Sequence, residues 1–473
     1  MKQSNYNIFV PYEPDNVYIG YNCVSGGLYV FNQRQFKMVE EILKDSNSGN
    51  NQELEGVREK LVKGRFLIDE DWDELKILKL RNNMTRYNPN SLAMVISPSL
   101  FCDFACDYCY VDREKVTMSP QTIKALKNFF KKRIEKSDVV EVCWTGGEPT
   151  LAIEVVEDLN SYFSNESLKK KAEFNCSMVT NGYSLTKQIV NRLKNCGIKK
   201  FQITLDGYRE YHDRYRHRPG GGKTYDRIIA NIEMASKEGV SIVLRSNINK
   251  DNYEGIYRLI DDLSERDINK ENFLFAPCMV MDVKTSKGHC SCNVFSNREF
   301  SLLEPDILLY SAKKGFNIMK EMLSTLRTFC GANTLSLYVI DAHGNILKCW
   351  CNLGRADNNK IGCIKEDGSI LFTDYKIFTK WMSWDPFDIE DCVNCKVLPL
   401  CMGGCMYYNI IEESDTIDIG CSHRRHNIEE MLKVFYFSQN KKISIDKDGM
   451  QSKRIKINNL KISNHRRKNG YGS

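Results

Sequence analysis

The chain has 473 residues, of which 42% are hydrophobic, enough for two or three domains with their own cores. No apolar run follows the N-terminal residues, and no stretch approaches the roughly 18 apolar residues of a membrane helix. We therefore expect neither a secretory signal nor a membrane span. The sequence holds 19 cysteines. Without a route to an oxidising compartment, clustered cysteines predict metal ligands and a cytoplasmic protein.

The net charge of +6 is unevenly distributed. Residues 441–473 contain ten Lys and Arg against two Asp, so the rest of the chain is slightly negative. This main body does not favour nucleic acid as a partner. We expect residues 440–473 to form a basic, disordered tail, with a docking strip for an acidic peptide or RNA as the alternative.

The first 85 residues carry no cysteine cluster and are predicted to form a separate small α+β module. Apolar runs between turn residues predict strands at 7–11, 17–21 and 27–31. Helical patterns follow at 33–43 and 54–62, and a third begins near Trp72.

Strands and helices alternate from Ser91 to about Met281. We predict strands at 92–97, 139–144, 174–180, 201–205, 241–247 and 272–277. Helices are predicted at 121–134, 155–163, 186–195, 225–237 and 253–263. Repeated βα units of this kind predict an α/β fold with a parallel, barrel-like sheet and helices outside it.

Three cysteines follow the first of these strands with the spacing C-x3-C-x2-C, namely Cys102, Cys106 and Cys109. Three soft thiolates on one loop suit iron–sulfur or zinc chemistry, and the missing fourth ligand leaves one coordination position open. For this spacing taken alone, a chance zinc loop is the alternative. With Tyr108 before the last cysteine and Trp144-Thr-Gly-Gly-Glu-Pro149 further on, however, the segment resembles the cluster loop of radical SAM enzymes.

This resemblance implies a partial (β/α)6 barrel over residues 88–285 and a [4Fe-4S] cluster held by the three cysteines. It also implies that S-adenosylmethionine (SAM) binds the fourth iron and is cleaved reductively to a 5'-deoxyadenosyl radical. The implied cofactor contacts follow successive strands, where barrel active sites lie. They are Tyr108, Gly146, Gly147, Glu148, Asn181, Thr204, Asp206 and Arg216. Taken singly, these motifs are also ordinary turns or surface charges, and His212 is interpreted as structural.

The C-terminal third contains a second cysteine pattern, which resembles the SPASM domain of peptide- and protein-modifying radical SAM enzymes. We place this domain at 325–435. By resemblance, a first auxiliary [4Fe-4S] cluster takes Cys330, Cys349 and Cys405. A second one takes Cys392, Cys395, Cys401 and Cys421. A pair of structural zinc sites is the alternative, because C-x2-C pairs also bind Zn²⁺.

The sequence departs from this pattern at two positions. Ser324 stands where full-complement relatives have another cysteine of the first auxiliary cluster. Cys290, Cys292 or Cys351 substitutes for it, or an open iron binds a substrate thiolate. Trp350 stands where sulfatase-maturing relatives carry an acidic base, which weakens that interpretation.

The resemblance implies a maturase of ribosomally made precursor peptides, with residues 1–85 as a winged-helix-like module that recognises the leader peptide. A structural cap is the alternative for this module. Thioether formation is the favoured reaction, ahead of carbon–carbon cross-linking and formylglycine formation, with ferredoxin or flavodoxin as electron donor. An RNA modifier that uses the basic tail and a non-catalytic, zinc-stapled peptide-binding protein are the alternatives from other classes.

Overall fold

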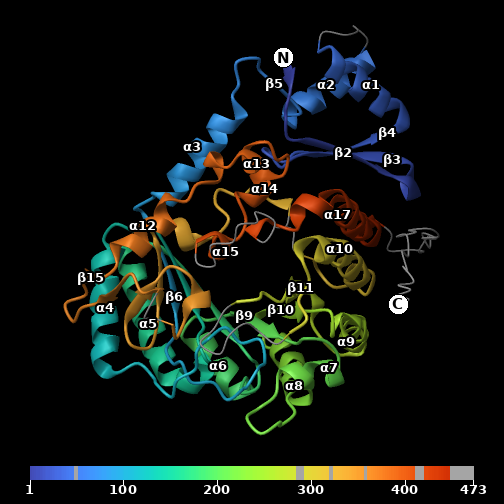
Figure 1. Cartoon of the computed structure of the whole chain (residues 1–473). Coiled ribbons are helices and arrows are strands. Elements are labelled where there is room, and N and C mark those ends of the chain that lie inside the picture. The colour runs from blue at the N-terminus through green and yellow to red at the C-terminus, as the bar shows by residue number, and fades with distance from the viewer. Residues whose placement is uncertain (47–51, 284–291, 319–322, 356–358, 411–419, 448–473) are drawn as a thin grey trace, which may run out of the picture.

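The computed structural model describes residues 1–46, 52–283, 292–318, 323–355, 359–410 and 420–447. Its centre is a ten-stranded mixed sheet with the strand order β11-β10-β9-β8-β7-β6-β12-β13-β14-β15 (Figure 1). Within these ranges no helix is long and apolar enough to cross a membrane.

Six strands of this sheet run parallel in chain order and carry the predicted βα alternation. They are β6 (Ser91–Ile96), β7 (Val139–Trp144), β8 (Glu173–Thr180), β9 (Lys200–Thr204), β10 (Ser241–Ile248) and β11 (Phe273–Met279). Each begins and ends within two residues of its predicted limits. The alternation of apolar residues therefore located these strands correctly, because one face of each is buried against helices.

Helices connect these parallel strands. They are α4 (Pro120–Ile134), α5 (Ile153–Lys170), α6 (Lys187–Asn195), α7 (Arg209–Tyr215), α8 (Tyr225–Ser236) and α9 (Tyr253–Glu265). Ser119 caps α4, with Pro120 at its first position, and Thr186 caps α6, as their side-chain oxygens predict. The main core lies between these helices and the sheet, and includes Trp144, Phe130 and Phe163. Only α7, a seven-residue helix, was not predicted.

The C-terminal third extends the same sheet, which the sequence did not predict. Strand β12 (Leu337–Ile340) pairs in parallel with β6, and β13 (Asn345–Leu347), β14 (Gly362–Ile364) and β15 (Ile370–Phe372) follow as an antiparallel meander. The edge of β6 is thereby covered rather than left open. Backbone hydrogen bonds thus join the parallel strands directly to the cysteine-rich region.

The N-terminal module has the predicted three strands and three helices. Strands β2 (Asn7–Tyr12), β3 (Val17–Asn22) and β4 (Leu28–Asn32) form an antiparallel sheet beside α1 (Gln33–Lys44) and α2 (Gln52–Lys63). A short pair, β1 (Lys2–Gln3) with β5 (Leu67–Ile68), closes it. Helix α3 (Glu74–Arg86) then leads to β6.

The remaining helices lie in the C-terminal region. They are α10 (Asn297–Lys313), α12 (Tyr375–Ser383), α13 (Glu390–Val393), α14 (Leu398–Cys401), α15 (Met406–Ile410) and α17 (Arg424–Lys447). Single 3-10 turns occur at 13–15, 149–152, 270–272, 331–333, 350–352 and 386–388. Figure 1 shows α13, α14 and α15 between the N-terminal module and the central sheet.

Apolar side chains join these layers. Tyr6, Ile8 and Val10 of the N-terminal module pack with Leu398 and Leu400 in one buried cluster. Arg86 at the end of α3 adds a buried polar link to the C-terminal region, because its Nη2 donates to Met382 O. Residues 448–473 of the predicted basic tail lie outside the described residues, as does Cys290.

Candidate active site and cysteine groups

The cysteine triplet occupies the loop between β6 and α4. Two backbone hydrogen bonds fix this loop to the segment that follows α7: Ala105 N donates to His217 O at 2.7 Å, and Asp107 N donates to Tyr215 O at 3.2 Å. The loop is therefore anchored on both sides of Arg216, which the sequence placed among the cofactor contacts. Cys102 Sγ accepts a hydrogen bond from Phe104 N at 3.4 Å.

Gly146 and Gly147 pack against the residues that lead into the cysteine loop. Gly147 N donates to Ser99 O at 3.0 Å, and Glu148 N donates to Phe101 O at 2.8 Å. A Cβ atom on Gly146 would lie 2.1 Å from Ser97 Oγ, and one on Gly147 would lie 2.1 Å from Phe101 O. Gly146 also has a φ of +122°, which side chains rarely tolerate. These glycines thus allow the two motifs to lie side by side.

Glu148 is buried and links the ends of β7 and β8. Its Oε1 accepts hydrogen bonds from Thr150 Oγ1 and Thr180 Oγ1, both at 2.7 Å, and its Oε2 accepts one from Asn181 N at 2.7 Å. Thr150 N adds a fourth bond at 3.1 Å. A carboxylate offers about four lone-pair sites. The side chain therefore positions the loops around the site.

Asn181 connects this carboxylate to the cysteine loop. Its Nδ2 donates to Asp103 Oδ1 at 2.9 Å, while its Oδ1 accepts from Tyr183 N at 2.9 Å. Thr204 is the last residue of β9 and is buried two residues before Asp206. The turn motifs after successive strands thus converge at one edge of the sheet, beside the cysteines.

Tyr108, Asp206 and Arg216 form a buried polar network with Asn247. The Tyr108 hydroxyl donates to Asp206 Oδ2 and accepts from Arg216 Nη1 at 2.7 Å and from Asn247 Nδ2 at 3.0 Å. Asn247 N also donates to Asp206 Oδ1 at 2.8 Å. The sequence indicated Asn247 only as the end of the fifth strand. A search for polar residues at every strand end would have found it.

His212 forms hydrogen bonds that hold this network in place. Its Nδ1 accepts from Asp206 N at 3.2 Å, and its Nε2 lies 3.0 Å from Thr224 Oγ1, which in turn donates to Arg216 O at 2.5 Å. Burial, together with the nearby Arg216 charge, holds the pKa of His212 well below its usual value. A neutral imidazole with Nδ1 as acceptor fits these contacts. His212 is thus a positioning residue.

The loop thiols suit a metal cluster in their chemistry and charge. Burial raises the pKa of Cys106 to about 12, against the opposing effect of Arg216, and burial also raises the pKa of Cys102. Such thiols ionise when a metal cation replaces their protons. Arg216 Nε is buried, makes no hydrogen bond within the described ranges and lies 4.0 Å from Asp206 Oδ2.

Among the described residues, no three His, Cys, Asp or Glu side chains meet the spacing needed to hold a single metal ion. A Zn²⁺ ion needs sulfurs about 2.3 Å from one centre. A four-iron cube holds its thiolates further apart. The absence of such a group among the described residues therefore argues against a single-ion site. It does not argue against a [4Fe-4S] cluster on the cysteine triplet.

Cys330, Cys349 and Cys405 come together although distant elements carry them. Burial, together with the neighbouring Cys349 and Cys330 thiols, raises the pKa of Cys405 to about 12. Cys349 and Cys405 also pack at the edge of a cluster that contains Tyr110, the residue after Cys109. This first auxiliary group therefore lies next to the cysteine loop.

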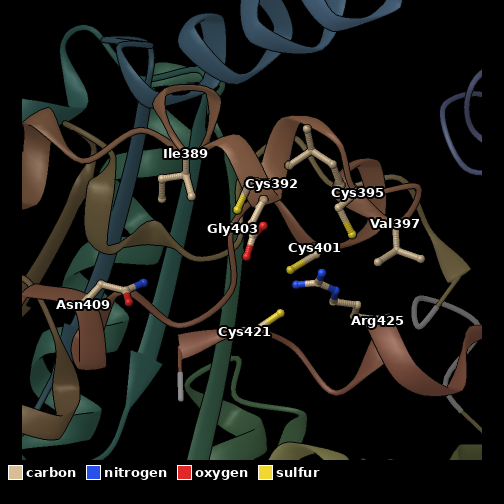
Figure 2. Close-up of a pocket in the computed structure, with 11 residues that line it drawn as sticks. Ile389, Cys392, Cys395, Val397, Cys401, Gly403, Asn409, Cys421 and Arg425 are labelled. Atoms are coloured by element: carbon tan, nitrogen blue, oxygen red, sulfur yellow. The ribbon is translucent and has the colours of Figure 1, made fainter. Parts of the chain in front are cut away.

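Cys392, Cys395, Cys401 and Cys421 line a common pocket (Figure 2). Neighbouring thiols add to the burial that raises the pKa of Cys392 to about 12 and that of Cys401 to about 11. Arg425, on α17, borders the same cavity and hydrogen-bonds to the Cys421 side chain. Four thiols and a cation around one space are a donor set that fits an anionic iron–sulfur cluster.

Comparison with known proteins agrees with this geometry. Residues 96–269, which contain the cysteine triplet and all the polar contacts described above, match the model of the Radical SAM superfamily. The chain is a radical SAM enzyme. Its cofactors are accordingly SAM and a [4Fe-4S] cluster, for which the triplet supplies the thiolates in our proposal.

The enzyme is similar to a curated relative, the cysteine-type anaerobic sulfatase-maturating enzyme of Clostridium novyi. The two are 23% identical over 334 residues, covering 67% of this chain and 88% of the relative. The match extends well beyond the residues of the family model.

Two solved structures share the fold. One is anSMEcpe with bound AdoMet and a peptide, with a TM-score of 0.56 and 17% identity, covering 75% of this chain and 98% of that chain. The other is Streptococcus suis SuiB bound to its precursor peptide SuiA, with a TM-score of 0.50 and 17% identity, covering 88% of this chain and 98% of that chain. The enzyme is thus related in fold to peptide maturases.

Proposed function

We propose that the enzyme is a maturase that modifies a ribosomally made precursor peptide, most simply by forming a thioether. The carrying observation is the extent of the fold match. The SuiB structure, which is bound to a precursor peptide, covers 88% of this chain, whereas the anSMEcpe structure covers 75%. An N-terminal module in addition to the parallel strands and the cysteine-rich region supports a substrate with a leader segment.

In this proposal the parallel strands form the partial barrel of residues 88–285, and residues 325–435 form the SPASM domain. Cys102, Cys106 and Cys109 hold the catalytic [4Fe-4S] cluster. When bound, this cluster and SAM supply a 5'-deoxyadenosyl radical that removes a hydrogen atom from the substrate. The protein's contribution is to place SAM and the peptide carbon together and to keep water out.

The buried polar network holds SAM. Arg216 offers its Nε, which makes no hydrogen bond within the described residues, to an anionic or hydroxyl group of SAM. Tyr108, Asp206 and Asn247 fix the guanidinium in place, with Asp206 Oδ2 4.0 Å from Nε. SAM is also contacted by the backbone of Gly146 and Gly147, by the side chain of Asn181 and by Thr204 on β9. Glu148 acts through the loops that it joins.

The N-terminal sheet receives the leader peptide. Its strand order is β2-β3-β4, so within the described residues β2 and β4 are its edges. Tyr12 of β2 packs against Tyr436 of α17, with ring centroids 5.0 Å apart. Strand β4 is thus the edge on which an extended peptide can add a strand.

The cysteine-rich region takes up the surplus electron of bond formation. A thioether forms when a carbon loses a hydrogen atom and a thiol loses a proton, so one electron must leave the substrate. The first auxiliary group lies next to the cysteine loop through Tyr110. Two auxiliary [4Fe-4S] clusters, held by the thiols named above, would accept this electron, and a ferredoxin or flavodoxin would supply the electron for SAM cleavage.

Formylglycine formation is the second candidate, because the sulfatase-maturating enzyme covers two thirds of this chain. Trp350 speaks against it, since this exposed indole follows Cys349 where the resemblance expects an acidic base. An indole N–H donates a hydrogen bond but accepts no proton at neutral pH. Thioether formation requires no base at that position.

The test is the mass of a short cysteine-containing peptide from a neighbouring reading frame after anaerobic incubation in D2O with reconstituted enzyme, reductant and SAM. A thioether removes two hydrogens from the peptide. The Cys106→Ala variant is the matched control and should leave the mass unchanged. A gain of one deuterium would indicate epimerisation. SAM cleavage without any change in mass would reject the peptide as substrate.

A further inference from the structure

Cys351 is a buried thiol beside the first auxiliary group. Its exposed fraction is 4%, and it packs with Val283 and Tyr407 in the cluster that Cys349 and Cys405 border. The Cys349 and Cys351 side chains are in hydrogen-bond contact. Cys351 therefore faces the same space as Cys349, two residues earlier in the chain.

The backbone explains how both thiols reach one side. Cys349 is extended, with φ −125° and ψ 134°, and a single 3-10 turn follows over residues 350–352. Trp350 between them is 40% exposed, whereas Cys351 and Asn352 are buried. The side chain between the two cysteines is thus turned outward, and both cysteines are turned inward.

The position where related proteins carry the fourth cysteine belongs to a different part of this enzyme. Ser324 is exposed, and its neighbours bind elsewhere: Thr325 Oγ1 donates to Cys23 O at 2.9 Å, and Leu326 N donates to Pro399 O at 2.8 Å. Leu323 and Leu326 pack in the cluster that includes Tyr21 and is bordered by Cys392 and Cys395. Residue 324 thus lies on the side of the second auxiliary group.

Cys292 is also placed away from the first group. It packs with Tyr215 and Val280, beside Tyr108 of the cysteine loop. Among the candidate substitutes that the structure describes, only Cys351 shares an apolar cluster with Cys349 and Cys405.

Two buried N–H groups, one in the residue after Cys351 and one in a ring near Cys349, make no hydrogen bond within the described residues. Asn352 is fully buried, and neither its Nδ2 nor its Oδ1 has a partner there. Trp381 Nε1 is likewise unpartnered, and its ring packs in a cluster that Cys349 borders. Leaving a buried donor unpaired is destabilising. Thiolate and sulfide sulfurs are the acceptors that such donors commonly meet around iron–sulfur clusters.

We infer that Cys351 is the fourth thiolate of the first auxiliary cluster, with Cys330, Cys349 and Cys405. A C-x-C pair thereby replaces the ligand that is missing at position 324. The inference rests on the proposed function, because it takes the first group to hold a [4Fe-4S] cluster. Four thiolates close every iron of that cluster to outside ligands. The cluster then accepts electrons and does not anchor a substrate sulfur.

The test uses the full chain with Cys102, Cys106 and Cys109 replaced by alanine, so that only auxiliary clusters remain. This background should hold about eight irons in two [4Fe-4S] clusters. Adding Cys351→Ala should lower the iron content toward about four per chain, or leave a cluster whose electron paramagnetic resonance spectrum is altered. Cys363→Ala, which changes a cysteine on β14, is the matched control and should change neither.

If the cluster stays assembled in the Cys351→Ala variant, a second measurement asks whether one of its irons can bind an external ligand. Adding ¹³C-labelled cyanide to the reduced background should give no ¹³C coupling to the first auxiliary cluster, because no iron is open. The same probe should couple after Cys351→Ala. Coupling of equal strength in both proteins, or a full iron content with an unchanged spectrum, would overturn the inference. A background that holds no iron would instead reject the auxiliary clusters of the proposed function.

Discussion

The two cysteine regions of this enzyme are built in opposite ways. The triplet lies within eight residues of one loop, from Cys102 to Cys109. With Cys351, the eight proposed auxiliary ligands extend from Cys330 to Cys421 and come from short helices and from the turns and loops between them. Neighbouring strand ends surround the first site with polar partners, whereas the second group is bordered by apolar packing between the N-terminal module and the cysteine-rich region.

The two regions therefore need different contacts in order to form. The triplet requires only the parallel strands, because Gly147, Glu148 and Asn181 bind its loop from adjacent strand ends. The auxiliary groups require contacts over long distances in sequence, such as Leu398 against Ile8. Changes in one region should therefore leave the other intact, and the following predictions test that independence.

The largest effect is expected for Cys106→Ala. Removing one of three thiolates leaves the catalytic cluster with too few ligands, so SAM cleavage should fall to the rate without enzyme. The measurement is 5'-deoxyadenosine release, with iron bound by the auxiliary groups assayed in the same sample. Cys143→Ala on β7 is the control and should keep full cleavage. Retained cleavage in Cys106→Ala would remove the central assignment.

Arg86→Ala should instead damage the C-terminal region. The Arg86 side chain is 1% exposed, its Nη2 donates to Met382 O, and its Nη1 lies 3.6 Å from Asp385 Oδ2. Breaking one partner of a buried ion pair costs about 3–5 kcal/mol. We expect a loss of this size in the free energy of unfolding, measured by urea titration.

Lys79→Ala is the matched control for Arg86, because Lys79 pairs with the same Asp385 from a side chain that is 44% exposed. An exposed pair contributes about 1 kcal/mol or less. Equal effects of the two variants would show that burial of Arg86 is not what joins α3 to the cysteine-rich region.

Arg216→Lys should weaken SAM binding while both cysteine regions keep their iron. Lysine cannot reproduce the planar guanidinium that bonds Tyr108 and presents a second N–H group. A lost hydrogen bond between charged groups corresponds to about 1.5–3 kcal/mol, or at least a tenfold rise in the Kd of SAM. Anaerobic calorimetry measures this, with Arg209→Lys on α7 as the exposed control. An unchanged Kd would place Arg216 outside the cofactor site.

His212 should make stability depend on pH. Its pKa is depressed in the folded state, so below the unfolded value of about 6.5 the unfolded chain binds a proton that the folded chain does not. The stability contribution is therefore present above pH 6.5 and is lost on acidification, by at most about 1.4 kcal/mol per pH unit.

Urea unfolding between pH 5.5 and 7.5 tests this expectation. His212→Gln should reduce the slope of stability against pH, whereas His426→Gln, at an exposed position, should not. Identical slopes in His212→Gln and the unaltered enzyme would mean that other groups dominate the titration in this range.

The smallest effect is expected for Arg425→Gln, next to the second auxiliary group. The guanidinium hydrogen-bonds to the Cys421 side chain and favours the more negative, reduced form of a bound cluster. Its loss should lower the reduction potential by roughly 20–60 mV, since the side chain is exposed and partly screened. Redox titration followed by electron paramagnetic resonance measures the shift. Lys433→Gln, further along α17, is the control.

Much of the enzyme was predictable from sequence because it depends on local patterns. The pattern of apolar runs located the six parallel strands within two residues of their limits. The cysteine spacing and the Gly-Gly-Glu segment indicated the active-site loop. The predicted strand order also places polar motifs at one edge, because parallel strands end together.

The tertiary structure alone decided the rest. Pairing of β12 with β6, the partners of Glu148 and the role of His212 all depend on residues that are far apart in sequence. The same holds for Cys351: its sequence neighbours left it equivalent to Cys290 and Cys292, and only packing placed it beside Cys349 and Cys405. Periodicity determines which face of an element is buried, but not which distant segment covers it.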